Sequence, residues 1–149
     1  MLIRRDRAML AITVMLDIAF HSGRATTVGA ADIAARLGLA RRGMEPLLQL
    51  LSRAGLLESI RGPRGGYRLG RPRRDIRAAD IAAAATADEP APAGGPTGPL
   101  QSGVVDAVWA ELNQAATARL AGLSLDDLMR RAAAAGMRRP VAEPISFAI

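Results

Sequence analysis

Residues 40–69 read ARRGMEPLLQLLSRAGLLESIRGPRGGYRL, and this stretch decides the fold of the chain. Apolar side chains recur through its first half at the spacing of one helix face. These side chains are Leu47, Leu48, Leu50 and Leu51. Polar side chains occupy the other face, namely Arg41, Arg42, Glu45, Gln49 and Arg53. The pattern predicts an amphipathic helix that packs its leucines inward and presents a largely cationic face to a partner.

A β-hairpin is predicted directly after this helix. Residues 56–60 form a short apolar strand, and residues 67–69 resume an alternating strand. Between them, residues 61–66 exclude a helix because they combine a proline with three glycines. The tip of the hairpin therefore carries Arg61 and Arg64. A basic helix followed by an arginine-tipped hairpin is the arrangement of a winged helix.

Two residues mark the ends of the predicted helix. Gly55 suits the left-handed conformation that closes many helices. Pro46 would cost about 3 kcal/mol in a helix interior but is tolerated in a first turn. We therefore expect the regular part of the helix to begin near residues 43–45, with Arg41 and Arg42 on its N-terminal approach.

Two further helices are predicted upstream. Residues 4–21 carry apolar side chains over a wide arc, which indicates packing against the core on one side and against a partner subunit's helix on the other. Packing against the core alone is the alternative. Residues 30–37 form a short helix that Gly38 closes. With the basic helix after it, this short helix makes a helix-turn-helix, in which the second helix is inserted into DNA.

The chain resembles a known family over most of its length. Residues 10–85, with LAITVMLDIAFHS, DIAARLGL and LLSRAGLLESIRGPRGGYRLGR, closely resemble the winged-helix transcription regulators of the IscR/NsrR type. The R-G-P-x-G-G-Y motif at residues 61–67 is the strongest signature, and a weaker similarity continues to residue 128. One departure is Gly43, where the family often has an aromatic residue.

The resemblance implies a fold and a set of roles. The fold is mainly α with a small β-hairpin wing: a winged helix-turn-helix followed by a long C-terminal helix. In such proteins the recognition helix enters the major groove, the wing reaches the minor groove, and the long helix forms the dimer. The implied partner is double-stranded DNA with an inverted repeat.

The basic residues are unevenly distributed along the chain. All 20 are arginines; residues 1–77 hold 15 of them against six acids, and residues 78–149 hold five against eight acids. The two parts carry +9 and −3, which sum to the net charge of +6. This division indicates that the N-terminal part binds a polyanion, with a merely solvated basic surface as the alternative. The cluster at residues 71–74 is expected to be a solvated or phosphate-facing linker.

The sequence offers candidates for each part of DNA recognition. Arg61 and Arg64 suit the narrow minor groove, whose negative potential attracts arginine. The arginines of the recognition helix suit phosphates or guanine. Because Glu45 opposes phosphate binding, we expect it to accept a hydrogen bond from a cytosine amino group, a base-reading role that the resemblance also implies. An ion pair with Arg41 or Arg42 is the alternative for this carboxylate.

The C-terminal part is predicted to form the dimer. After a helix at residues 76–87, the proline- and glycine-rich segment at residues 88–99 is expected to be mobile. A long helix from residue 100 to about residue 121 and a last helix at residues 124–136 follow. The long helix carries an apolar stripe suited to pairing with a second copy, made of Val105, Val108, Trp109, Leu112, Ala116 and Leu120. The expected division of the chain is a DNA-binding domain (1–86), a flexible loop (87–99), dimerisation helices (100–136) and a tail (137–149).

No cofactor, metal or catalytic site is predicted. Many members of the family that this chain resembles sense iron, oxidants or nitric oxide through an iron-sulfur cluster, held by three cysteines in the loop before the long helix. This chain has no cysteine, and the corresponding loop offers only the isolated carboxylates Asp88 and Glu89. The single histidine, His21, is better explained as a helix-end residue than as a ligand. The sequence shows no nucleophile paired with a base, no Walker-type loop and no pair of acidic residues placed to form a catalytic pocket. We therefore expect no enzyme activity.

The sequence as a whole predicts a bacterial transcription regulator of the cytoplasm. Its 149 residues contain no apolar run of membrane-spanning length, and the run at residues 8–20 lacks the cleavage site of a secretory signal, which is the alternative there. The expected function is a homodimeric, cluster-free regulator, a repressor rather than an activator. Control by a small molecule, a protein partner or abundance stays open. The alternative function is a degenerate winged-helix module that docks a protein without specific DNA recognition.

Overall fold

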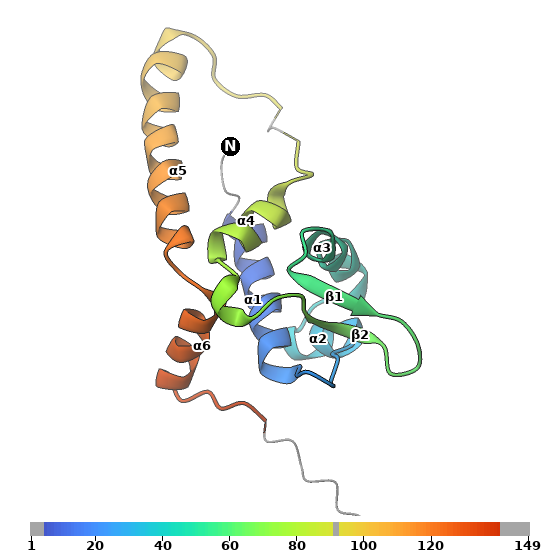
Figure 1. The fold of residues 1–149 in the computed structure, drawn as a ribbon. Helices are drawn as coiled ribbons and strands as arrows, with labels where there is room; N and C mark the ends of the chain where they lie inside the picture. The colour runs from blue at the N-terminus through green and yellow to red at the C-terminus, as the bar shows by residue number, and fades with distance from the viewer. Residues whose placement is uncertain (1–4, 91–92, 141–149) are drawn as a thin grey trace, which may run out of the picture.

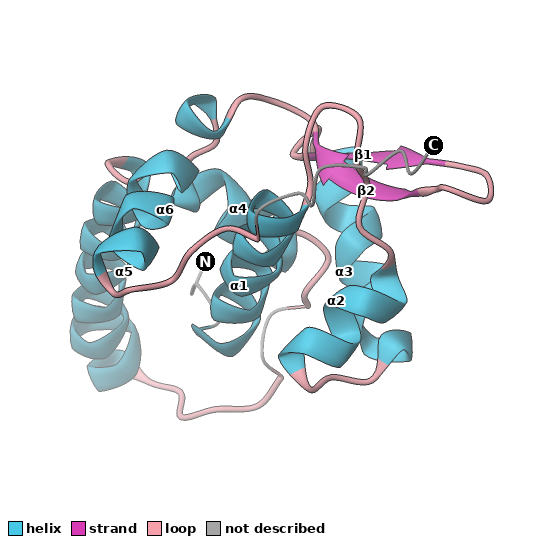
Figure 2. Ribbon diagram, turned by 90° about the horizontal axis from the view of Figure 1, so that it is seen from below, coloured by secondary structure: helices cyan, strands magenta, loops and turns pink. Residues whose placement is uncertain are grey.

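The structure is a computed structural model that describes residues 5–90 and 93–140. Its elements are arranged around a central helix. This helix is α1 (Arg5–His21), and α2, α4, α6 and the second strand of the hairpin pack against it (Figure 1). Helices α4 and α6 lie on one side of α1, and α2, α3 and the hairpin lie on the other (Figure 2). No described helix is both long enough and apolar enough to cross a lipid bilayer.

Only part of the wide apolar arc of α1 faces the core. Its fully buried side chains are Ala11, Val14, Met15 and Ile18. Met9 is exposed, and Leu10, Ile12, Leu16 and Phe20 pack only partly against the core. Because apolar side chains extend over a wide arc of this helix, periodicity alone does not select the buried face, and the packing partners decide it.

The helix-turn-helix agrees with the sequence prediction at its turn. Helix α2 (Ala30–Leu37) ends at Gly38, which has a φ of 65°, and the amide of Leu39 donates to the carbonyl of Ala34 at 2.9 Å. This left-handed glycine with its long-range amide bond closes the helix as a Schellman motif. The chain then enters α3 (Arg41–Arg53).

The start of α3 corrects the prediction that its regular part begins near residues 43–45. The helix begins at Arg41, so Arg41 and Arg42 form its first turn and Pro46 lies inside it. The amide that a proline lacks at this position would have bonded to the carbonyl of Arg42. Because Arg42 is exposed in the first turn, solvent can reach that carbonyl, and the helix continues through the proline.

A two-stranded antiparallel hairpin follows α3. Strands β1 (Leu57–Ile60) and β2 (Gly66–Leu69) pair in a register that sets Leu57 opposite Leu69 and Ile60 opposite Gly66. Five residues, 61–65, therefore form the tip. The predicted strands and turn are confirmed to within one residue.

The C-terminal elements differ in detail from the prediction. A 3-10 turn, η1 (Arg73–Asp75), precedes α4 (Ala78–Thr86), which is shorter than the helix expected at residues 76–87. The described residues between 88 and 97 form neither helix nor strand. The long helix consists of a π-helical turn, η2 (Gln101–Val105), and α5 (Asp106–Ala121). The last helix is α6 (Leu125–Ala134).

Helix α6 returns to the N-terminal core. Its side chains Leu125 and Met129 belong to the same buried cluster as α1, and the amide of Leu125 donates to the carbonyl of Ile76 at 2.8 Å. By contrast, α5 has no buried residue; it contacts α4, and its N-terminal part projects beyond the other helices (Figure 1). The assignment of residues 100–136 to dimerisation stays a prediction. Within this range, α6 packs against the core and α5 does not.

Candidate nucleic-acid interface

The exposed side of α3 carries the polar residues that the sequence predicts. Arg41, Arg42, Glu45, Gln49 and Arg53 are all exposed. The opposite side packs Met44, Leu47, Leu48 and Leu51 into the core, and Leu50 is half-buried. Met44 was not among the predicted core residues, although its spacing of three and four from Leu47 and Leu48 could have identified it. A single amphipathic helix therefore holds one cationic face away from the core.

The first turn of α3 has an electrostatic arrangement that does not favour folding. Arg41 and Arg42 lie at the helix N-terminus, and no acidic residue is in this turn. The N-terminus of a helix carries a partial positive charge, so arginines there are destabilising unless an anion is bound. The same turn combines free amides with two guanidinium groups, which is a favourable environment for a phosphate group.

Glu45 pairs with Arg41 in the unbound chain. The Nε of Arg41 lies 3.2 Å from Oε1 of Glu45, and the side chains are 65% and 50% exposed. Exposed pairs of this kind contribute about 0–1 kcal/mol, and the order with arginine preceding glutamate is the weaker one. The ion pair that was the alternative for this carboxylate is therefore present, and it is weak enough to exchange for a DNA group.

The glycines of the hairpin tip are required by close backbone approaches. A Cβ on Gly65 would lie 2.4 Å from the carbonyl oxygen of Ile60, and a Cβ on Gly66 would lie 2.6 Å from that of Val28. Neither distance is compatible with a side chain, so the paired glycines let the hairpin close against its neighbours. The R-G-P-x-G-G-Y motif thus has a steric explanation at both of its adjacent glycines.

The segment that precedes α2 braces the hairpin. Val28 and Tyr67 exchange two backbone hydrogen bonds of 2.9 and 2.8 Å. The hydroxyl of Thr27 donates to the carbonyl of Arg64 at 2.9 Å. Nη1 of Arg68 donates to the carbonyl of Arg24 at 3.0 Å. The sequence prediction missed this brace; the only local signal is the β-branched run at residues 26–28, which favours an extended backbone.

The arginines of the tip are available to a partner. Arg61 and Arg64 are exposed, and neither makes an ion pair within the described ranges 5–90 and 93–140. The same holds for Arg42 and Arg53 on α3 within these ranges. Two cationic groups at a braced tip and two on a packed helix are thus ready to bind an anionic surface.

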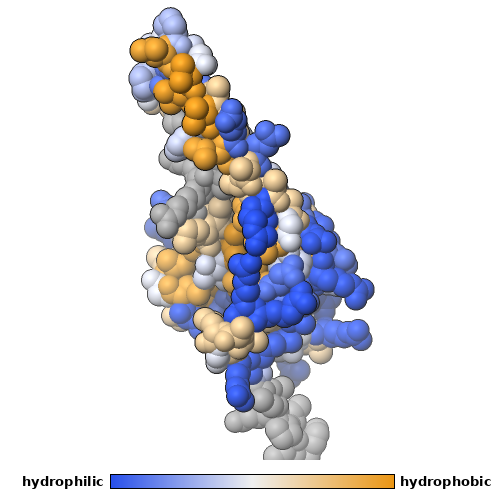
Figure 3. All heavy atoms as spheres, turned by 90° about the vertical axis from the view of Figure 1, so that its left-hand side faces the viewer, coloured by the Kyte–Doolittle hydropathy of each residue, from blue (hydrophilic) through white to orange (hydrophobic). Residues whose placement is uncertain are grey.

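A second surface feature is the apolar side of η2 and α5. The predicted stripe residues Val105, Val108, Trp109 and Leu112 are each about half exposed, Ala116 is exposed and Leu120 is half-buried. Leu100 and Val104 extend the same apolar surface at its N-terminal end. Figure 3 shows hydrophobic side chains gathered along this projecting part of the molecule. Contiguous exposed apolar surface of this kind is typical of an interaction site.

Known proteins share this architecture. Residues 5–131 match the family described as "Rrf2: Iron-dependent Transcriptional regulator". The HTH-type transcriptional regulator IscR of Photobacterium profundum is 37% identical over 128 residues, which cover 84% of this chain and 74% of that protein. Among solved structures, T. potens IscR has a TM-score of 0.69 at 30% identity, with 90% of each chain covered. CymR, the global cysteine regulator of B. subtilis, has a TM-score of 0.64 at 27% identity, with 84% of this chain and 94% of that chain covered. These structures confirm the predicted fold class.

The family description implies iron, and the residues of this chain do not fit an iron site of the cysteine type. The sequence contains no cysteine, and the described residues bring no three histidine, aspartate or glutamate side chains together around a metal position. Glu89 is paired with Arg7 at 3.4 Å. His21 is the last residue of α1, with Nδ1 at 2.9 Å from the carbonyl oxygen of Asp17, which is the helix-end position expected for it.

Proposed function

Because the chain belongs to the Rrf2 family of transcriptional regulators, which bind DNA and are not enzymes, we propose that it is a homodimeric repressor that recognises an inverted repeat without an iron-sulfur cluster. The observation that carries this proposal is the braced hairpin with two exposed tip arginines, which directly follows the helix α3 and its exposed cationic face. Such a regulator acts on the chromosome, so its place is the cytoplasm of a bacterial cell.

The proposed DNA contacts divide between the two elements. The N-terminal turn of α3 supplies Arg41 and Arg42 for a phosphate or a guanine edge. Glu45 leaves its weak ion pair and accepts from a cytosine amino group, while Gln49 and Arg53 lie farther along the same exposed face. The tip supplies Arg61 and Arg64 to the minor groove, so the two elements together hold one half-site.

The proposed dimer pairs the apolar side of α5 with that of a second copy. The half-exposed Trp109 and Leu112 are the centre of this surface, and burying them removes apolar area from water. A two-fold axis between the copies would place two recognition helices in the same relation as two half-sites of an inverted repeat. Repression then needs only occupancy of a promoter, with no further contact to the polymerase.

The test compares DNA binding of matched arginine pairs. Arg61→Ala with Arg64→Ala should weaken binding to a selected genomic fragment and lower the slope of log affinity against log salt by about 2, since each lost phosphate-type contact lowers it by about 1. The control is Arg131→Ala with Arg138→Ala, which removes the same charge from exposed positions on and after α6. It should leave both affinity and slope close to those of the unchanged chain.

Two outcomes of this experiment would contradict the proposal. Equal effects of the two pairs would mean that only the net charge matters for DNA binding. Normal binding by the tip variant would mean that the hairpin does not contact DNA, which favours the alternative of a protein-docking module. Selection should be carried out without added iron, because tight, sequence-specific binding under those conditions supports cluster independence.

A further inference from the structure

A second group of arginines lines a hollow of about 860 Å³ between the end of α1, the base of the hairpin, η1 and α6. The arginines that line it are Arg24, Arg68, Arg71, Arg73, Arg74 and Arg139. The acids that line it are Glu58 and Asp126, so the lining carries a net charge of +4, six minus two. None of the seven residues assigned above to DNA contacts belongs to this lining.

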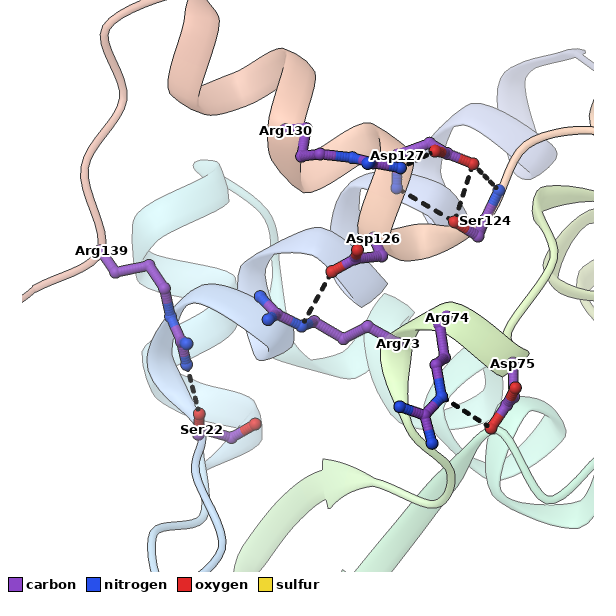
Figure 4. A network of polar contacts seen from close by, with 9 residues as sticks. All are labelled: Ser22, Arg73, Arg74, Asp75, Ser124, Asp126, Asp127, Arg130 and Arg139. Atoms are coloured by element: carbon purple, nitrogen blue, oxygen red, sulfur yellow. Dashed lines mark hydrogen bonds and ion pairs between the residues drawn. The ribbon is translucent and has the colours of Figure 1, made fainter.

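The contacts inside the hollow neutralise only part of this charge. Arg68 pairs with Glu58 at 2.8 Å, and Arg73 pairs with Asp126 at 3.5 Å. Nη2 of Arg139 donates instead to a backbone carbonyl, that of Ser22, at 3.1 Å. Figure 4 shows Arg139 and Arg73 reaching toward the end of α1 and the start of α6 from different segments of the chain.

Two further guanidinium groups of the hollow are without a full countercharge. Arg71 donates hydrogen bonds to the carbonyls of Gly55 and Ala54 at 3.4 and 3.3 Å. These bonds satisfy two of its N–H donors but do not neutralise its positive charge. Arg74 has only a loose pair with Asp75 at 3.9 Å, and both of these side chains are largely exposed. Hydrogen-bond donors of the hollow thus remain open to a ligand.

Such clustering is unfavourable for the fold alone. Like charges that converge in a concave surface repel one another, and the low-dielectric walls focus their field outward. An anion held there removes the repulsion, and guanidinium groups match phosphate oxygens in a bidentate geometry. The volume also falls within the range of about 300–1,000 Å³ typical of small-molecule sites.

We propose that this hollow binds a small molecule that carries a phosphate or diphosphate group. A small anion fits it better than a DNA strand does, because guanidinium groups from several segments line one hollow and can contact a single anion from several sides, whereas a DNA strand needs cations spaced along its backbone. Its walls also come from segments more than 100 residues apart, since Arg24 precedes α2 and Arg139 follows α6. A ligand there would tie α6 to the base of the hairpin. Binding at the hollow does not depend on the DNA-binding role proposed above.

The test is a calorimetric titration of the full chain with inorganic pyrophosphate, in the absence of DNA and of phosphate buffer. We expect saturable binding with one site per chain. Arg24→Ala with Arg74→Ala should weaken it by on the order of tenfold or more, since each lost charge-assisted hydrogen bond has an effect of that size. Arg119→Ala with Arg131→Ala removes the same charge from exposed positions on α5 and α6, outside both the hollow and the proposed DNA contacts, and should leave pyrophosphate binding unchanged.

Each of three results would overturn the assignment. The first is a wild-type chain that binds no pyrophosphate saturably. The second is an equal loss in the two arginine pairs, which would mean binding by net charge alone. The third is tighter binding of citrate than of pyrophosphate, which would mean a carboxylate site.

A DNA titration of the same variants separates this proposal from the proposed function. Arg61→Ala with Arg64→Ala at the hairpin tip should lose affinity for the selected fragment while keeping pyrophosphate binding, and Arg24→Ala with Arg74→Ala in the hollow should do the reverse. If the hollow pair instead loses DNA affinity and the chain binds no pyrophosphate, the hollow is a DNA-backbone contact and the small-molecule assignment is wrong. Because Arg24 and Arg74 are exposed, circular dichroism should show both variants folded.

Discussion

Arg36 of α2 donates two hydrogen bonds to the carboxylate of Asp17 in α1, from Nε to Oδ1 at 2.9 Å and from Nη2 to Oδ2 at 2.7 Å. The Asp17 side chain is only 7% exposed, whereas that of Arg36 is 33% exposed. This bidentate pair fixes both the distance and the rotation between the two helices. It therefore positions the first helix of the helix-turn-helix on the central helix.

The unequal burial of this pair predicts unequal effects of removing its two members. Arg36→Met removes the guanidinium from the buried carboxylate of Asp17, leaving Nδ1 of His21 at 3.6 Å as its one remaining ion-pair partner among the described residues, and should lower the free energy of unfolding by about 2–4 kcal/mol. Asp17→Asn leaves a guanidinium that solvent can reach, and should cost only about 1–2 kcal/mol. Urea unfolding of both variants measures the difference. An equal loss, or a larger loss in Asp17→Asn, would contradict the assigned roles.

Replacing glycine by alanine should change the stability of the chain in opposite directions at Gly66 in the hairpin and Gly43 in α3. Gly66→Ala places a Cβ against the carbonyl of Val28 and should destabilise the chain by about 1–3 kcal/mol. Gly43→Ala is its matched control, because Gly43 lies within α3 and a Cβ there meets nothing within 4 Å. That variant should gain about 0.5–1 kcal/mol from improved helix propensity. Urea midpoints that move in the same direction for both would refute the steric explanation of the motif.

The capping box at the start of α6 predicts a pH dependence. Asp127 accepts hydrogen bonds from the amide and the hydroxyl of Ser124 and pairs with Arg130, which together lower its pKa from 3.8 to about 2. Because the folded chain binds this proton less tightly than the unfolded chain, the stabilising contribution is complete above about pH 4 and is lost as the pH falls toward 2.

Asp127→Asn isolates this contribution. Its melting temperature should be lower than that of the unchanged chain near neutral pH, and the difference should shrink as the pH falls from about 4 to about 2. Thermal unfolding followed by circular dichroism gives the comparison, since every other titrating group is common to both chains. A difference that stays constant over this range would mean that the Asp127 carboxylate is not what stabilises the cap.

The apolar side of α5 predicts a change of oligomeric state. Leu112→Glu places a charge in the centre of the proposed interface and should convert the dimer to a monomer in sedimentation experiments. Affinity for a complete inverted repeat should then fall at least about tenfold, because the two half-sites are no longer linked. Gln114→Glu is the control, since two residues along a helix is about 200° around its axis. Dissociation by the control alone would place the interface on the other side of α5.

Local signals in the sequence were sufficient for the elements that carry the proposed DNA contacts. The leucine spacing of α3, the glycine at residue 38 and the strands around the arginine tip all appear in the structure where the pattern predicts them. Each depends on residues within about one turn or one hairpin of each other, where backbone preferences act directly. The alternation of polar and apolar positions also predicted which side of α3 is exposed.

Contacts between distant segments decided the rest. Periodicity could not select the buried face of α1, predict that residues 27 and 28 brace the hairpin, or pair Asp17 with Arg36 nineteen positions later. The start of α3 at Arg41 depends on solvent around one carbonyl in the folded chain, which overrides the local preference of Pro46.

The sequence by itself determined the winged helix, the cationic face of α3 and the arginine tip, and because it contains no cysteine it offers no thiolate ligand for a cluster. The tertiary structure decided that α6 closes the N-terminal core, that α5 projects with its apolar side uncovered, and that arginines from both ends of the chain line one hollow. The physical reason is the range of the interactions. Helix and turn preferences act between neighbours, whereas burial and charge clustering arise only when the packed chain brings distant residues together.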